Sequence, residues 1–255
     1  MDALRRYYVE HGDLWERQTL TRARLVLGDR RLGRRVREAL RELVYGEALP
    51  RAALAEIVEV RTRMEVELGK ETRGRWHVKF GRGGLVDVEF LAQALQLVHG
   101  AAHPDVRRTS TTAALAGLGR AGALNPDTAA ALAEHHRFLH RVSTALRLLG
   151  ARPTDTLELA GPMPGRVASA LGLGARDAFL ATYRERTSAV RGTYEAALSA
   201  DGALSADAAL TGEGALSGEG PLSGEGALSQ EDERSRRPST TAHPRFEPGK
   251  RHPLQ

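Results

Sequence analysis

The chain has 255 residues and a formal net charge of +5 at pH 7, and 41% of its residues are hydrophobic but only 5% aromatic. A core must therefore rest on Leu, Ala and Val, which suit helix-on-helix packing better than a pleated sheet. There is no cysteine, which excludes a disulfide scaffold, thiol catalysis and thiolate metal sites. The composition favours a cytoplasmic protein.

The distribution of charge and apolar residues argues against membrane and nucleic-acid partners. No apolar run approaches the ~20 residues that cross a bilayer, and MDALRRYYVEHGD at the N-terminus lacks the apolar region of a secretory signal. Arginine supplies most of the positive charge and is interleaved with acids. This pattern is more typical of solvated helix faces than of a nucleic-acid surface, which is the less favoured alternative.

Apolar residues recur at helical spacing over most of the first 200 residues. The predicted helices cover residues 14–27, 32–45, 51–68, 85–98, a short segment that Thr109 or Ser110 caps and that ends near Gly119, 127–149, 165–171 and 175–198. The segment WHVKF at 76–80 could be a strand or a linker, and residues 151–165 contain three prolines without a clear period. We therefore expect an all-α helical bundle over residues 1–200.

The C-terminal region, residues 201–255, differs in composition. Leucine recurs every six residues at 204, 210, 216, 222 and 228, among glycine, serine and acids, and a basic, proline-rich stretch follows. A hexapeptide period can indicate a parallel β-helix. Each unit here has too few apolar residues to bury a core, so a disordered low-complexity tail is the favoured interpretation.

The stretch KFGRGGLVDVEF at 79–90 could be taken for a phosphate-binding loop. A P-loop needs glycines followed by Lys and then Ser or Thr, whereas here Lys79 precedes the glycines and Leu85 follows them. No strand-turn-helix unit surrounds them, as a dinucleotide site would require. The favoured interpretation is a helix entrance, in which Gly83 and Gly84 permit a sharp turn and Asp87 lies in the first helical turn.

Metal binding is not predicted from the spacing of acids and histidines. Asp87 and Glu89 would lie ~200° apart around a helix and could not readily chelate one ion together. His136 and His140 have the i,i+4 spacing of zinc ligands, but the sequence shows neither the acid of the protease pattern nor a third ligand.

The arginines near apolar positions allow two interpretations. Arg61 borders the apolar face of its helix, and buried ion pairing with Glu65 at i+4 is the favoured one. In the alternative, Arg22, Arg24 and Lys79 line a site for a polyanion or a nucleotide phosphate.

Several motifs occur in an order that resembles a known family. They are Trp15-Glu16-x-Gln18-x-Leu20-x-Arg22-Ala23-Arg24, then Arg61-x-Arg63-Met64-Glu65-x-Glu67, and then Lys79-x-Gly81-x-Gly83-Gly84-Leu85-Val86-Asp87-Val88-Glu89-Phe90-x-x-Gln93. Over residues 4–198 the chain resembles the bifunctional glutamine synthetase adenylyltransferase/adenylyl-removing enzymes. It is similar to the helical domain that follows a nucleotidyltransferase core, in the C-terminal, adenylylating half.

The resemblance implies AMP transfer from ATP to a tyrosine of glutamine synthetase, reversal by phosphorolysis, use of Mg²⁺, and control by PII signalling proteins and glutamine. The family's catalytic Gly-Ser segment and Asp-x-Asp pair do not occur upstream of Trp15. We therefore expect no catalytic residue and no cofactor in this chain alone, a core encoded upstream, and an internal or misassigned start at Met1. The alternative is a catalytically inert module that binds glutamine synthetase or a PII protein.

Five residues within these motifs are candidates for contact with the core or its nucleotide. They are Arg22, Arg24, Lys79, Asp87 and Glu89. Roles at the interface or within the fold are favoured over phosphate contact.

Overall fold

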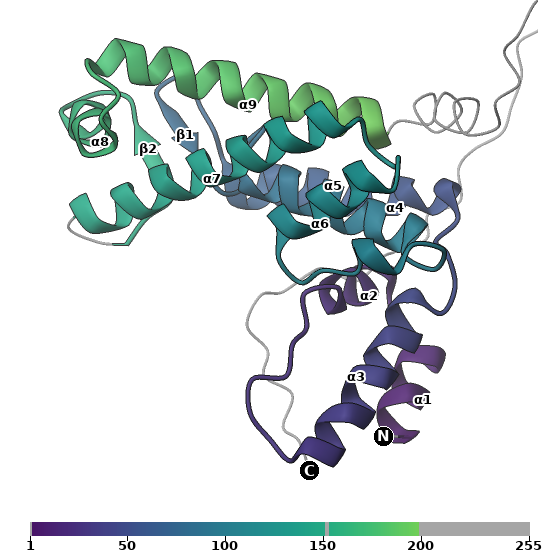
Figure 1. The fold of residues 1–255 in the computed structure, drawn as a ribbon. Coiled ribbons are helices and arrows are strands. Elements are labelled where there is room, and N and C mark those ends of the chain that lie inside the picture. The colour runs from purple at the N-terminus through teal and green to yellow at the C-terminus, as the bar shows by residue number, and fades with distance from the viewer. Residues whose placement is uncertain (1, 151–152, 199–255) are drawn as a thin grey trace, which may run out of the picture. The chain divides into compact units, whose positions relative to one another are not determined.

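Helices dominate the computed structural model, which describes residues 2–150 and 153–198 (Figure 1). The helices are α1 (Asp2–Glu10), α2 (Leu14–Leu20), α3 (Arg30–Tyr45), α4 (Leu54–Met64), α5 (Leu85–His99), α6 (Thr111–Arg120), α7 (Pro126–Leu149), α8 (Met163–Leu171) and α9 (Arg176–Leu198). All described residues belong to one compact unit. The predicted helical class is confirmed, while the expectations for the tail, 201–255, lie outside the described residues. No helix in the described part of the chain is long and apolar enough to cross a membrane.

The N-terminal segment differs from the prediction in two ways. Residues 2–10 form a helix that apolar spacing did not reveal. The helix predicted over 14–27 ends at Leu20, where the hydroxyl of Thr21 donates to the carbonyl of Gln18 at 2.7 Å. This hydrogen bond and three-residue turns close the helix, so Arg22 and Arg24 lie in the connection to α3.

The helix predicted over 51–68 is present but is divided into three parts. A 3₁₀ turn (Arg51–Ala53) leads into α4, and a π-helical turn (Glu65–Gly69) follows it. Lys70 then adopts a left-handed backbone conformation, with φ of 47°. Its N–H donates to the carbonyl of Glu65, which ends the helix by satisfying one of its last acceptors.

A short ribbon of two strands is the exception to the helical architecture. β1 (Arg75–His77) pairs antiparallel with β2 (Thr156–Glu158), and Trp76 lies opposite Leu157. The strand interpretation of residues 76–80 is therefore confirmed for its first residues. Its partner was not predicted, because three residues beside several prolines carry too little periodicity to be recognised.

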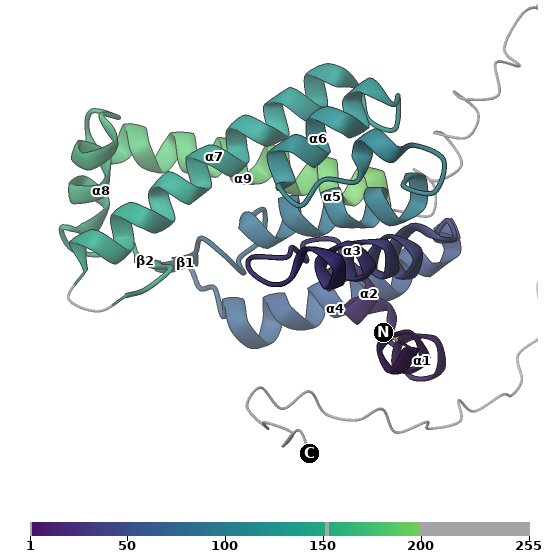
Figure 2. The ribbon, with the colours of Figure 1, turned by 60° about the horizontal axis from the view of Figure 1, so that its bottom comes forward.

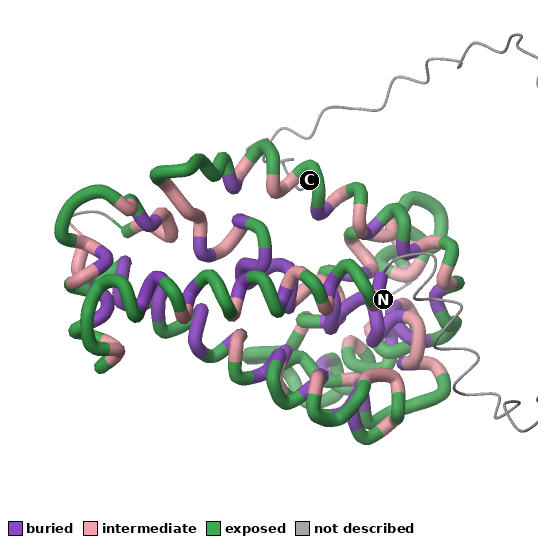
Figure 3. Tube along the Cα trace, turned by 90° about the horizontal axis from the view of Figure 1, so that it is seen from above, coloured by how far each residue is buried: buried purple, intermediate pink, exposed green. Residues whose placement is uncertain are grey.

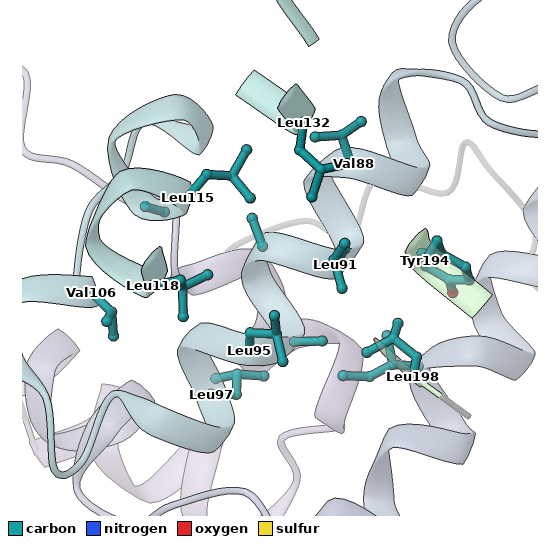
Figure 4. Packing of buried hydrophobic residues seen from close by; sticks show 14 of the residues in the cluster. Val88, Leu91, Leu95, Leu97, Val106, Leu115, Leu118, Leu132, Tyr194 and Leu198 are labelled. Carbon is teal, nitrogen blue, oxygen red and sulfur yellow. The ribbon is translucent and has the colours of Figure 1, made fainter. Parts of the chain in front are cut away.

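Helix α5 lies at the centre of the larger hydrophobic cluster. Apart from Glu89 and Phe90, every residue from Leu85 to Leu97 is buried, because other helices pack around α5 on several sides (Figure 2). Its apolar side chains meet those of α6, α7 and α9 (Figure 4). The residues labelled there are Val88, Leu91, Leu95, Leu97, Val106, Leu115, Leu118, Leu132, Tyr194 and Leu198. A helix that is buried all round must be mostly apolar, as α5 is.

A second cluster joins the C-terminal half of α7 to the ribbon, α8 and the start of α9. Leu139, Leu157 and Phe179 are fully buried within it. Buried positions recur at helical intervals along the long helices (Figure 3). α7 contributes to both clusters, through Leu132 in the first and Leu139 in the second, so it connects the two parts of the core.

A pair of leucines on α7 tests this packing. Leu139 is 0% exposed and Leu148 is 79% exposed. Replacing a buried Leu by Ala removes apolar contacts and leaves a cavity, so Leu139→Ala should lower the free energy of unfolding by about 2–5 kcal/mol. Leu148→Ala should change it by less than about 0.5 kcal/mol. Urea unfolding followed by circular dichroism measures both, and equal effects would contradict the described core.

Candidate functional site

The glycine-rich entrance to α5 is shaped by a carboxylate in the helix's first turn. Gly83 has φ of 71°, and its N–H donates to Oδ2 of Asp87 at 2.7 Å. A Cβ placed on Gly83 would lie 1.9 Å from the carbonyl oxygen of Thr187 on α9, so the residue must be glycine for both reasons. The predicted helix entrance is confirmed, with Gly84 at the N-cap position and Asp87 in the first turn.

Asp87 and Arg61 form a fully buried ion pair, and both residues are 0% exposed. Nε of Arg61 donates to Oδ1 of Asp87, and Nη2 donates to the carbonyl of Gly81 at 2.9 Å. Glu65, the partner expected from i+4 spacing, lies farther away, at 3.6 Å from Nη1. Buried pairing of Arg61 is thus confirmed, but its close partner comes from another helix.

Arg191 on α9 extends this pair into a network. Its Nη1 lies 2.9 Å from Oε2 of Glu65 and 3.3 Å from Oδ2 of Asp87, and its Nε donates to Glu195 at 2.8 Å. Glu195 also accepts from Arg82 at 2.7 Å. The network therefore joins α4, the entrance loop, α5 and α9. The sequence offered only the i,i+4 spacing of Arg191 and Glu195, and nothing in it linked Arg191 to Asp87.

Glu89 has a different set of neighbours. Its Oε1 lies 3.0 Å from Nη1 of Arg22 and 3.7 Å from Nε2 of His136 on α7. Burial works to raise the pKa of Glu89, but His136 and Arg22 outweigh it and hold that pKa below its usual value. Asp87 and Glu89 therefore contact separate partners, in agreement with their spacing on the helix.

Two glutamines in the motifs connect α2 to α5. Nε2 of Gln18 donates to Oε1 of Gln93 at 2.9 Å, and both side chains are buried. Arg17 on the same helix donates to the carbonyl of Val44 at 2.9 Å, which fixes α2 to the end of α3. Sequence reasoning gave these residues no role, because a buried amide pair has no recognisable spacing in a single chain.

The candidate cations have separate surroundings in this structure. Arg22 pairs with Glu89, while Nζ of Lys79 lies 4.8 Å from the centre of the Phe80 ring. Arg24 is exposed in the connection between α2 and α3. No contact described for these residues brings the three side chains together.

The acidic candidates do not fit the Mg²⁺ that the resemblance implies. Mg²⁺ prefers several oxygen ligands in octahedral geometry. The oxygens of Asp87 already accept from Arg61, Gly83 and Arg191, and Glu89 pairs with Arg22. Within residues 2–150 and 153–198, the group of three metal-ligating side chains that converges is Glu89, His136 and His140. The sequence had left the two histidines without a third ligand, and the fold brings Glu89 to them.

The geometry defines a helical domain in which the glycine-rich motif, residues 83–88, is buried at the entrance to α5. Residues 51–198 match the family model of the GlnD PII-uridylyltransferases, and residues 1–39 match that of the glutamate-ammonia ligase adenylyltransferases. The first match covers more than half of the chain, which therefore belongs to that family of domains.

The curated relatives agree with this assignment. A bifunctional glutamine synthetase adenylyltransferase/adenylyl-removing enzyme of Streptomyces avermitilis is 40% identical over 168 residues, which make up 65% of this chain and 16% of that protein. The protein of the same name from Bradyrhizobium diazoefficiens is 32% identical over 202 residues, 78% of this chain and 20% of the relative. The resemblance inferred from the motifs is confirmed, and the chain spans a fifth or less of these relatives' length.

Removing the buried carboxylate tests the network. Asp87→Asn removes the close partner of the buried Arg61 guanidinium and leaves only Glu65, at 3.6 Å, as an opposite charge, so it should lower the free energy of unfolding by about 3–5 kcal/mol. Asp177→Asn is the matched control, because that exposed carboxylate also lies in the first turn of a helix, α9. It should cost less than about 1 kcal/mol. Similar losses in the two variants, measured by urea unfolding, would contradict a buried pair.

The requirement for glycine at position 83 is tested by adding a single methyl group there. Gly83→Ala should destabilise the fold by more than about 2 kcal/mol, because the positive φ and the Thr187 carbonyl both oppose a Cβ. Gly74→Ala is the control, since nothing lies within 4 Å of a Cβ placed there. Thermal unfolding of the two variants should differ clearly, and a tolerated Gly83→Ala would show that the entrance is not as tightly packed as described.

Proposed function

We propose that this chain is the helical part of a glutamine synthetase adenylyltransferase, and that it positions a nucleotidyltransferase core for AMP transfer from ATP to a tyrosine of glutamine synthetase. The catalytic carboxylates, ATP and Mg²⁺ belong to that core, which another segment supplies. The complex acts in the cytoplasm, and a PII protein controls it. The names of the relatives support glutamine synthetase as the partner.

The observation that carries this proposal is that Asp87 is buried and that both of its carboxylate oxygens are already hydrogen-bonded. A general base or a metal-binding carboxylate must present a lone pair to substrate or ion. Asp87 is fully buried, and its two oxygens are bonded to a guanidinium, a backbone N–H and a second arginine. The most specific motif of the chain therefore serves the shape of the domain, which fits a supporting role better than a chemical one.

The connection between α2 and α3 is where we place the contact with the core. It contains the adjacent exposed residues Leu25, Val26 and Leu27, of which Val26 is 84% exposed. A continuous run of exposed apolar side chains commonly marks a surface that a partner covers. The segment also carries Arg24 and lies within residues 1–39, which match the adenylyltransferase family model.

Reconstitution tests the proposed function. Purified full-length chain, glutamine synthetase, labelled ATP and Mg²⁺ should give no AMP transfer, because the two candidate acids, Asp87 and Glu89, are held in ion pairs with arginines. Addition of the nucleotidyltransferase segment of the Streptomyces avermitilis relative should restore transfer. Val26→Asp should lower the restored rate at least about tenfold by placing a charge in an apolar contact.

Leu148→Asp on α7 is the matched control, because Leu148 is equally prominent on the surface but lies outside the connection between α2 and α3. It should leave the restored rate unchanged. Transfer by the chain alone would contradict the supporting role. Binding of glutamine synthetase or PII without transfer, even when the core binds the chain, would instead favour the inert interaction module.

A further inference from the structure

We propose that Glu89, His136 and His140 form a binding site for a divalent transition-metal ion of the zinc type, and that the ion competes with Arg22 for Glu89. The three side chains come from two helices, Glu89 from α5 and the histidines from successive turns of α7. Neither the chain's sequence spacing nor its family resemblance assigns a metal to them.

The geometry suits such an ion. One ligand atom from each of the three side chains lies within 4.8 Å of the others, and Nε2 of His136 lies 3.7 Å from Oε1 of Glu89. Zinc bonds of about 2.1 Å in a tetrahedral site place neighbouring ligand atoms about 3.4 Å apart. The Glu89–His136 pair is already close to that spacing. Rotation of His140, which is exposed, can bring the third ligand into place.

His136 supplies a second, independent observation. Its side chain is only 8% exposed, yet its Nε2 has no hydrogen-bond partner among the described residues, and the nearest carboxylate oxygen is beyond hydrogen-bond distance. A buried polar nitrogen without a partner is unfavourable, and it is uncommon in folded proteins. An ion bound between Nε2 and Glu89 would satisfy it.

The chemistry of the three side chains also favours a transition-metal ion. Two imidazole nitrogens and one carboxylate are ligands for zinc or iron and not for Mg²⁺ or Ca²⁺, and they leave a fourth position open.

Arg22 is the built-in competitor for the site. Its guanidinium lies 3.0 Å from the same oxygen of Glu89 that approaches His136. A cation at Glu89 would repel Arg22, whose side chain is 45% exposed and can turn toward solvent. The metal ion and Arg22 compete for the same carboxylate of Glu89. Occupancy of the site by the ion therefore weakens the attachment of Arg22 to α5, and that attachment weakens ion binding by the same factor. The ion would thereby loosen the start of the connection between α2 and α3.

Cobalt and zinc titrations of the full-length chain, freed of metal by chelation, test the site. Co²⁺ should bind with one ion per chain and give visible absorption of tetrahedral intensity, and Zn²⁺ should displace it. His140→Ala and Glu89→Gln should each weaken Zn²⁺ binding at least about tenfold, because each removes a ligand. Circular dichroism confirms that these variants fold.

Two further variants distinguish the site from other histidines and from a simple ion pair. His135→Ala, on the same helix but outside the group, should bind Zn²⁺ like the original chain. Arg22→Ala should bind it several-fold more tightly, because the competitor is gone. The proposal is overturned if the chain binds no Co²⁺ at micromolar concentration, if binding survives loss of Glu89 and His140 unchanged, or if Arg22→Ala does not tighten it.

Discussion

The burial of Arg61 is the constraint on which the rest of the domain depends. A guanidinium removed from water must be paired and hydrogen-bonded, or the fold loses more than packing can restore. Asp87 and the Gly81 carbonyl meet this requirement, and both lie at the entrance to α5. The position of α4 relative to α5 is therefore set by charge as well as by apolar contact. Arg191 brings α9 into the same arrangement.

Much of the helical architecture could be predicted from periodicity, because α3, α5, α7 and α9 have apolar residues at helical spacing and clear ends. The end of α2 could not, since a hydroxyl of Thr21 competes for the helical carbonyls while the apolar pattern continues to Leu27. The strand partner at 156–158 was equally hidden, because its pairing with β1 is decided by tertiary contact.

In the candidate site, too, local features could be predicted from the sequence, whereas contacts between helices could not. Local spacing revealed that Asp87 shapes a helix entrance and that Asp87 and Glu89 diverge. It could not reveal which distant groups they meet, because Arg191 and His136 reach α5 only through the packing of α9 and α7. A single sequence shows on which face of its own helix a carboxylate lies. It does not show which residues of other helices that carboxylate contacts, because those contacts depend on the fold. The i,i+4 partner expected for Arg61, Glu65, is present at 3.6 Å, whereas the closer partner, Asp87, could not be found from spacing.

The β1–β2 ribbon has a consequence for how the chain assembles. It joins residues 75–77 to 156–158, so α5, α6 and α7 lie between its two strands in the sequence. Closing a loop of this length costs chain entropy that three residue pairs recover only in part. The ribbon is therefore expected to form after those helices have packed and brought its strands together. Pairing of β1 with β2 would then report that α5, α6 and α7 have already packed.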